Sequence, residues 1–174
     1  MIDKIYKRTI IDKITPYLNT KDAIILYGAR QVGKTSVLNY LVQHYLKENV
    51  FYFDLEYPVL LALCNGGPDN VVRYISQKGA DETKTIYLII DEIQYMDDPS
   101  KFIKLLTDHY PNFKLIVSGS STLDIKRKLK QSLAGRTISF ELYPLSFEEF
   151  LRFKEQHYVL MEDNEDIIND ELVF

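Results

Sequence analysis

The chain carries the run Gly28-Ala29-Arg30-Gln31-Val32-Gly33-Lys34-Thr35, with Ser36 directly after it. This run matches the pattern G-x-x-x-x-G-K-[ST], whose four fixed positions coincide by chance at roughly one in 10⁴–10⁵ starting points. An apolar run, residues 23–27, precedes it, and apolar residues at helical spacing follow it. A strand before and a helix after are the setting in which this pattern binds phosphate, so the sequence predicts a phosphate-binding loop.

The residue types of this loop suit the chemistry of a nucleoside triphosphate. Gly28 and Gly33 allow the backbone to curl so that successive N–H groups face phosphate oxygens. The helix that follows adds partial positive charge at its N-terminus. Lys34 supplies a cation for the β- and γ-phosphates and is also a catalytic candidate, while Thr35 supplies a hydroxyl ligand for Mg²⁺. We therefore expect residues 28–36 to hold the phosphates.

Two carboxylates, Asp91 and Glu92, follow the apolar run at residues 86–90. In phosphoryl transfer Mg²⁺ needs an acidic partner opposite the loop hydroxyl, and Asp91 at the strand end is the candidate metal ligand. Glu92 is then placed to orient and polarise the attacking water. An acidic pair after a strand is commonly no more than a solvated loop start, but the phosphate loop upstream favours the hydrolytic interpretation.

Hydroxyl groups end a further apolar run, residues 114–118, and an arginine precedes the last run of the chain. Ser118 and Ser120 are candidates to reach the attacking water or the γ-phosphate, with a turn or helix-capping role as the alternative. Arg136 is a candidate to stabilise transition-state charge on the ATP of a neighbouring subunit. A structural ion pair is the equally open interpretation of Arg136.

Strand-like runs alternate with helical segments along the chain. Three of the five runs are almost continuously apolar, as expected of strands that are buried on both faces. The alternation predicts an α/β fold, with a mostly parallel sheet covered by helices on both faces. We expect Asp69 to cap one helix and Ser146 to begin the last helix with a capping box. The five runs are residues 23–27, 50–55, 86–90, 114–118 and 137–142.

Composition and charge restrict the classes of function. The formal net charge of -4 argues against a general attraction to nucleic acid or anionic lipid. Cys64 is the only cysteine, which excludes an intramolecular disulfide and a cysteine-based metal site. The apolar runs are too short to span a bilayer, and the N-terminus lacks the apolar core of a signal peptide. We therefore expect a cytoplasmic protein with no membrane partner.

Several short motifs follow one another in a fixed order. They are the loop at residues 28–35, Asp91-Glu92-Ile93-Gln94, Gly119-Ser120-Ser121, Leu133-Ala134-Gly135-Arg136, and Pro144-Leu145-Ser146-Phe147 with Glu149-Phe150. In this order they resemble a prokaryotic branch of the AAA superfamily, and the resemblance extends over residues 5–151. The ordered set is much more specific than any single motif.

The resemblance implies the three-layer sandwich of a P-loop NTPase, with strands in the order 5-1-4-3-2 when they are numbered along the chain. It implies ATP and Mg²⁺ at the C-terminal ends of the strands, and a hydrolase activity. Residues 1–160 are then the AAA-type ATPase core. Residues 161–174 are expected to be an acidic tail or the start of a further C-terminal region, since members of the family usually continue beyond this length.

The leading interpretation is Mg²⁺-dependent ATP hydrolysis, coupled to an unidentified partner or to a missing C-terminal region. A nucleotide-gated binding switch with slow hydrolysis is the alternative. Glu92 weighs against a P-loop kinase, and the absence of an Asn-Lys-x-Asp segment weighs against a GTP switch. A homo-oligomer in which Arg136 acts in trans is a further expectation, and nucleic acid is expected as a partner only through the missing region.

Overall fold

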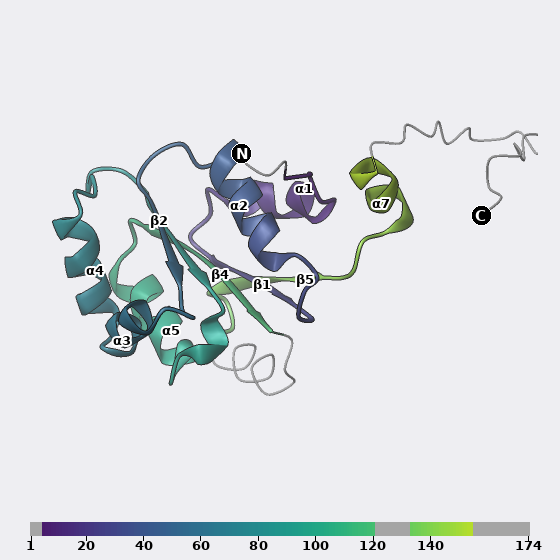
Figure 1. Cartoon of the computed structure of the whole chain (residues 1–174). Helices are drawn as coiled ribbons and strands as arrows, with labels where there is room; N and C mark the ends of the chain where they lie inside the picture. The colour runs from purple at the N-terminus through teal and green to yellow at the C-terminus, as the bar shows by residue number, and fades with distance from the viewer. Residues whose placement is uncertain (1–4, 121–132, 155–174) are drawn as a thin grey trace, which may run out of the picture.

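The computed structural model describes residues 5–120 and 133–154. Within them, five parallel strands form one sheet in the order β2-β3-β4-β1-β5 (Figure 1). The strand order that the resemblance implied is confirmed, and the sheet is parallel throughout, where a mostly parallel sheet was expected. The strands are β1 (Ala23–Gly28), β2 (Val50–Asp54), β3 (Ile86–Asp91), β4 (Phe113–Ser120) and β5 (Thr137–Leu142).

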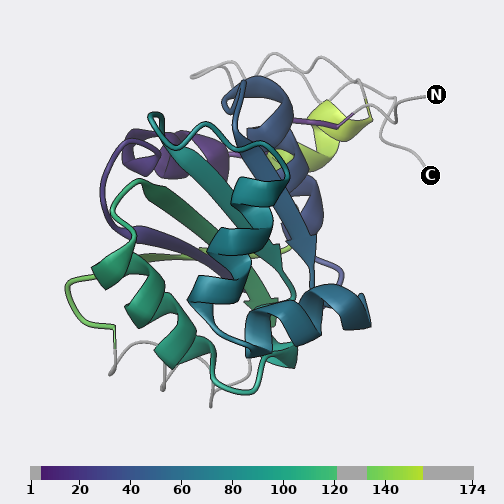
Figure 2. The same cartoon turned by 90° about the vertical axis from the view of Figure 1, so that its left-hand side faces the viewer.

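Helices cover both faces of this sheet and produce the three expected layers (Figures 1 and 2). Helices α3, α4 and α5 pack on one face, whereas α1 and α2 pack on the other. None of the described helices is long and apolar enough to cross a membrane. The helices and 3₁₀ turns are α1 (Ile10–Ile14), η1 (Thr15–Tyr17), α2 (Lys34–His44), α3 (Pro58–Asn65), α4 (Pro68–Gln77), η2 (Ile93–Tyr95), α5 (Pro99–His109) and α7 (Phe147–Phe153).

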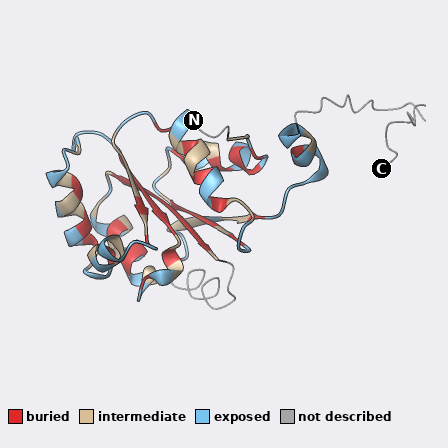
Figure 3. Ribbon diagram, in the orientation of Figure 1, coloured by how far each residue is buried: buried red, intermediate tan, exposed pale blue. Residues whose placement is uncertain are grey.

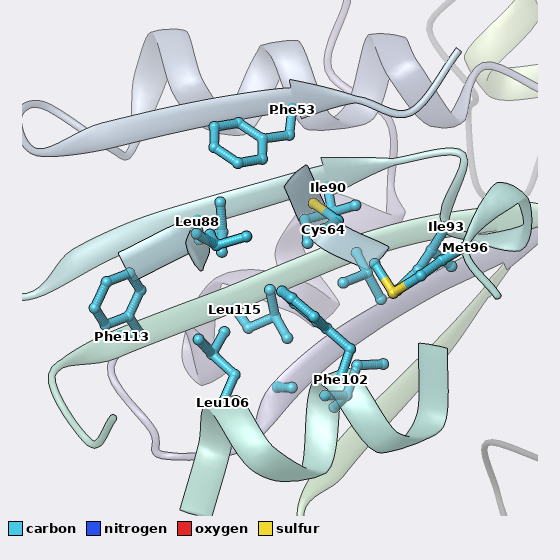
Figure 4. Packing of buried hydrophobic residues seen from close by; sticks show 14 of the residues in the cluster. Phe53, Cys64, Leu88, Ile90, Ile93, Met96, Phe102, Leu106, Phe113 and Leu115 are labelled. Atoms are coloured by element: carbon cyan, nitrogen blue, oxygen red, sulfur yellow. The ribbon is translucent and has the colours of Figure 1, made fainter. Parts of the chain in front are cut away.

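Side chains along the central strands alternate between the two helical layers. On β3, Leu88 and Ile90 join the apolar cluster under α3, α4 and α5, whereas Ile89 between them joins the cluster under α1 and α2. The pleat of a strand gives this period of two. Both faces of the central strands are therefore buried (Figure 3), which is why these strands read as continuous apolar runs. Figure 4 shows the cluster on the α5 side.

The start of α4 differs from the expectation. The N-cap residue is Gly67, with a φ of 100°, so the prediction that Asp69 caps this helix is wrong. Pro68 holds the first helical turn, where its fixed φ is favourable and no N–H is required. Asp69 instead accepts a 2.6 Å hydrogen bond from the Tyr110 hydroxyl, and this contact joins α4 to the end of α5.

Helix α7 begins with the expected capping box, formed by Ser146 and Glu149. The Glu149 carboxylate also accepts 2.8 Å hydrogen bonds from the N–H and the hydroxyl of Thr9, and it lies 3.0 Å from Nε of Arg8. Both charged residues are buried, Glu149 with 3% and Arg8 with 5% of its surface exposed. A buried ion pair therefore docks α7 on the N-terminal segment.

The environment of Glu149 makes this docking dependent on pH. Burial acts to raise the pKa of Glu149, but the close contact with the Arg8 guanidinium and hydrogen bonds from Ser146 and Thr9 outweigh it and lower the pKa from 4.5 to about 2. Because the folded-state pKa lies below the unfolded-state pKa, the carboxylate contributes stability above about pH 4.5. That contribution is lost progressively as the pH falls toward about 2.

We expect the substitution Glu149→Gln to weaken the acid dependence of stability. Between about pH 7 and about pH 3, the wild-type protein should lose about 2 kcal/mol more free energy of unfolding than the variant, because the variant has no carboxylate to protonate. Urea denaturation at the two pH values measures this difference. Glu148→Gln, a change at an exposed position in the same helical turn, should keep the wild-type dependence. Equal losses in the wild type and Glu149→Gln would contradict the prediction.

Candidate functional site

The loop that the sequence assigns to phosphate leaves β1 at Gly28 and enters α2 at Lys34. A Cβ atom at Gly28 would lie 2.5 Å from the Leu142 carbonyl oxygen of β5, so only glycine fits where the loop turns away from the sheet. Gln31 and Gly33 have positive φ angles, 63° and 93°. These left-handed residues curl the backbone just before the N-terminus of α2, where helical N–H groups carry partial positive charge.

The side chain of Lys34 folds back over this loop. Its Nζ donates to the carbonyl oxygens of Gly28 at 3.3 Å and Ala29 at 3.1 Å, and the residue is only 5% exposed. Carbonyl oxygens carry partial rather than full negative charge, so they compensate a buried ammonium group incompletely. The arrangement therefore favours an anion beside the loop.

Asp91, at the end of β3, accepts hydrogen bonds from three neighbouring elements. Its Oδ2 accepts from the Thr35 hydroxyl of α2 at 2.7 Å and from the Tyr52 hydroxyl of β2 at 2.8 Å. Its Oδ1 accepts from the Ser118 hydroxyl of β4, and from the Glu92 N–H at 3.1 Å. Asp91 is 3% exposed, so these donors rather than water stabilise the carboxylate.

Tyr52 is a site residue that the sequence pattern did not identify. It pairs with Ile89 in the register of β2 and β3, and its ring reaches the end of the neighbouring strand. Burial, followed by the charge of Asp91, raises the pKa of Tyr52 above its ordinary value, so its hydroxyl stays protonated and remains a donor. The only signal in the sequence was a tyrosine in the strand-like run before the one that ends in Asp91. That signal does not predict that the two strands are neighbours in the sheet.

Glu92 adopts a left-handed conformation, with a φ of 57°. Its carboxylate accepts a hydrogen bond from the Gln94 amide, and the Gln94 oxygen accepts one from the Ser120 N–H at 3.0 Å. Gln94 therefore ties Glu92 to the end of β4. A left-handed conformation in a residue other than glycine is unfavourable by roughly 1–2 kcal/mol, and such strain is concentrated at functional sites.

The structure brings most of the expected site residues to one edge of the sheet, where parallel strands end together. Within the loop, Arg30 and Ser36 are exposed and Val32 is half-buried. Ser121 and residues 161–174 lie outside the described residues. The residues gathered at this edge are Lys34, Thr35, Asp91, Glu92, Ser118 and Ser120.

Arg136 lies at the opposite edge, just before β5 begins. Its carbonyl oxygen accepts a 2.9 Å hydrogen bond from the N–H of Ala23, the first residue of β1. Its Nε forms a 2.7 Å ion pair with Asp108 of α5. Within one chain Arg136 therefore has a structural partner, and its role toward a neighbouring subunit stays a prediction.

A cavity of about 530 Å³ lies apart from this site, between the α3–α4 turn and α5. Its lining includes Cys64, Met96, Phe102 and Tyr110 but no residue of the loop at 28–36. Burial raises the pKa of the Cys64 thiol to about 12, so the thiol is not a nucleophile at neutral pH. The residues to which the sequence assigned the chemistry therefore lie outside this cavity, around Asp91.

A family model described as "AAA domain" matches residues 20–151, which include the loop and the acidic end of β3. The chain belongs to this family. AAA domains are typically ATPases, so membership supports a nucleotide-binding domain in broad terms. The five-stranded order seen in the sheet is the one found in AAA structures.

Two curated proteins with similar sequences extend the comparison. The chain is 30% identical to the uncharacterized protein MJ1544 of Methanocaldococcus jannaschii, over 87% of this chain and 32% of that protein. It is 25% identical to the ORC1-type DNA replication protein 11 of Haloarcula marismortui, over 69% of this chain and 38% of that protein. The chain thus spans about a third of the length of these relatives.

A solved structure supports the AAA fold. The structure of Caenorhabditis elegans PCH-2 superposes with a TM-score of 0.56 at 17% sequence identity, covering 82% of this chain and 45% of that one. At this identity the likeness concerns the fold alone.

Proposed function

We propose that this AAA domain binds ATP with Mg²⁺ at residues 28–36 and hydrolyses it. The observation that carries the proposal is the 2.7 Å hydrogen bond from the Thr35 hydroxyl to the Asp91 carboxylate. It places two oxygen ligands, the Thr35 hydroxyl and the Asp91 carboxylate, next to each other at the phosphate loop. Mg²⁺ prefers oxygen ligands of this kind in a phosphate site.

Binding relies on the backbone N–H groups of residues 28–36 and on Lys34. The Lys34 ammonium exchanges its two carbonyl partners for phosphate oxygens, which carry more negative charge. Thr35 and Asp91 would hold Mg²⁺, which neutralises charge on the β- and γ-phosphates when bound. Across residues 5–120 and 133–154, no group of three or more His, Cys, Asp or Glu side chains is placed to hold a metal ion. Phosphate oxygens and water would therefore complete the coordination, as is usual for Mg²⁺.

The proposed base for hydrolysis is Glu92, which directly follows the proposed metal ligand Asp91. Its carboxylate orients the attacking water and accepts its proton. Ser118 donates to Asp91, so its role is to position that carboxylate. Ser120, at the end of β4, is the candidate for a hydroxyl contact with the water or the γ-phosphate.

A slowly hydrolysing switch is the second candidate function, and the contact between Glu92 and Gln94 favours it. While the Gln94 amide donates to the Glu92 carboxylate, one oxygen of this carboxylate is not available to orient the attacking water. Turnover then requires Glu92 to leave Gln94, and a protein in which this step is slow would hold ATP for long periods. Comparing a single turnover with steady-state phosphate release separates the two functions.

Coupling to other components is the remaining part of the proposal. We infer that residues 1–160 act as an ATPase core that drives a partner or a further region, because the chain spans only about a third of the length of these relatives. One relative is described as an ORC1-type DNA replication protein, so nucleic acid is a candidate partner only through such a region. The single cysteine, Cys64, is free and supports a cytoplasmic location.

We expect Lys34→Ala to weaken ATP binding by roughly 100-fold, because the variant loses charge-assisted hydrogen bonds to phosphate. Isothermal titration calorimetry with ATP and Mg²⁺ measures the affinity, and EDTA should lower it in the wild type. Arg30→Ala is the matched control, since it removes an exposed cation from the same loop and should keep most of the affinity. Unchanged binding in Lys34→Ala would refute the assignment of the loop.

We expect Glu92→Gln to keep ATP affinity within about threefold of the wild type and to lower turnover by roughly 10²–10⁴, because the base is lost and the loop is intact. Phosphate release under steady-state and single-turnover conditions measures the change. Glu56→Gln, at an exposed acidic position after β2, should behave like the wild type. Wild-type turnover in Glu92→Gln would exclude Glu92 as the base.

Arg136 is proposed to act on the ATP of a neighbouring subunit in a homo-oligomer. Specific activity should then rise with protein concentration. It should fall by roughly 10³-fold in Arg136→Ala, because the arginine that stabilises transition-state charge on the neighbouring ATP is missing. Asp108→Ala is the matched control, since it breaks the same ion pair but leaves the arginine. If both variants lose activity equally, Arg136 acts through its structural pair and the proposal in trans is wrong.

A further inference from the structure

Arg8 contacts three segments that lie far apart in the sequence. Its Nη1 donates to the Val32 carbonyl of the phosphate loop at 2.9 Å, and its Nη2 donates to the Tyr143 carbonyl after β5, also at 2.9 Å. Its Nε lies 3.0 Å from Oε1 of Glu149 in α7, in an ion pair where the N–H does not point at the oxygen. The rigid fork of a guanidinium group suits three such contacts, because its donors point in fixed directions.

The contact with Val32 sets the direction of one peptide group of the loop. A trans peptide is planar, with its C=O and N–H on opposite sides. Holding the Val32 oxygen on Arg8 therefore turns the N–H of Gly33 away from Arg8. The guanidinium also lies close behind Gly33, since a Cβ atom there would be 3.5 Å from Nη1. This N–H is one of those that the proposed function assigns to phosphate.

Glu149 connects Arg8 to the start of α7. Its Oε1 accepts 2.8 Å hydrogen bonds from Thr9, and its Oε2 accepts the Ser146 N–H at 3.0 Å to complete the capping box. Moving Glu149 would remove the first-turn cap of α7 and the charge partner of Arg8 together. A buried charge that loses its partner is strongly unfavourable, so the positions of Arg8 and α7 depend on each other.

Docking of α7 by itself explains only part of this arrangement. The contacts of Glu149 with Thr9 and of Arg8 with Tyr143 already join α7 and its preceding segment to the N-terminal segment. The bond from Arg8 to Val32 involves no atom of α7. It joins Arg8 to the phosphate loop instead.

We propose that Arg8 is a positioning residue for the phosphate loop, and that the Arg8–Glu149 pair couples the loop to the docking of α7. The use of this coupling in phosphate binding rests on the proposed function, whereas the coupling itself operates without nucleotide. Such coupling is reciprocal: a ligand that fixes the loop stabilises docked α7, and undocking of α7 loosens the loop.

Amide hydrogen exchange in the full chain tests the coupling without nucleotide, on peptides that cover residues 28–36 and 144–153. Arg8→Lys should raise exchange in both peptides by roughly tenfold, because an ammonium group cannot reproduce the three-way fork. Glu149→Gln should also raise exchange in the loop, although Glu149 does not contact it. Lys7→Gln is the matched control, because it removes an exposed cation that pairs with Asp12, and should match the wild type.

Nucleotide gives the second part of the test. In the wild type, ATP with Mg²⁺ should slow exchange at residues 144–153, and Arg8→Lys should lose this effect while its ATP affinity falls about tenfold. If Arg8→Lys fails to fold, Glu149→Gln carries the test. Faster exchange in α7 with an unchanged loop and unchanged affinity would overturn the proposal. A wild type that binds no nucleotide would refute the proposed function, and the nucleotide-free exchange would still decide the coupling.

Discussion

The arrangement of the candidate site depends on the hydrogen bonds that the buried carboxylate of Asp91 accepts. A carboxylate with 3% exposure is tolerated in the interior only while hydrogen-bond donors surround it. Those donors come from Thr35, Tyr52 and Ser118, on three elements that pack around β3. Because losing any donor would leave the charge less compensated, Asp91 holds the ends of these elements together. The same contacts place the hydroxyl of the loop beside the acidic strand end, so one constraint serves both the fold and the chemistry.

The elements and the main site motifs could be predicted from the sequence because their signals are local. A strand that is buried on both faces must be apolar at successive positions, as Leu88, Ile89 and Ile90 are. The capping box at Ser146 lies within one helical turn and formed as expected. The order of the strands is not local, and it followed from the resemblance of the ordered motifs rather than from any periodicity. The prediction for Asp69 failed where two local signals competed, because Gly67 and Pro68 already satisfied the start of α4.

The rest of the site could not be predicted because it depends on contacts between distant segments. Tyr52 reaches Asp91 only because β2 lies next to β3, and Arg8 reaches Val32 only because the N-terminal segment lies behind the loop. Neither residue is part of a recognisable sequence motif. Glu149 was recognised for its place in the capping box, but its second role as the partner of Arg8 depends on how α7 docks. Local sequence thus indicated the loop and the acidic residues of the candidate site, and tertiary packing determined which other residues hold them in place.

Two buried lysines show why burial of a charge does not by itself mark a functional group. Lys114, at the start of β4, donates to the carbonyl oxygens of Asp22 at 2.5 Å and Thr20 at 2.9 Å, and burial lowers its pKa to about 8. It ties the segment before β1 to β4 at the sheet edge that lies away from the loop. Lys34 has longer contacts, 3.1 and 3.3 Å, to carbonyls of the curled loop itself. Because longer hydrogen bonds are weaker, an incoming anion exchanges the partners of Lys34 more easily than those of Lys114. The contacts of each lysine, rather than its burial, therefore distinguish the proposed phosphate ligand Lys34 from the structural residue Lys114.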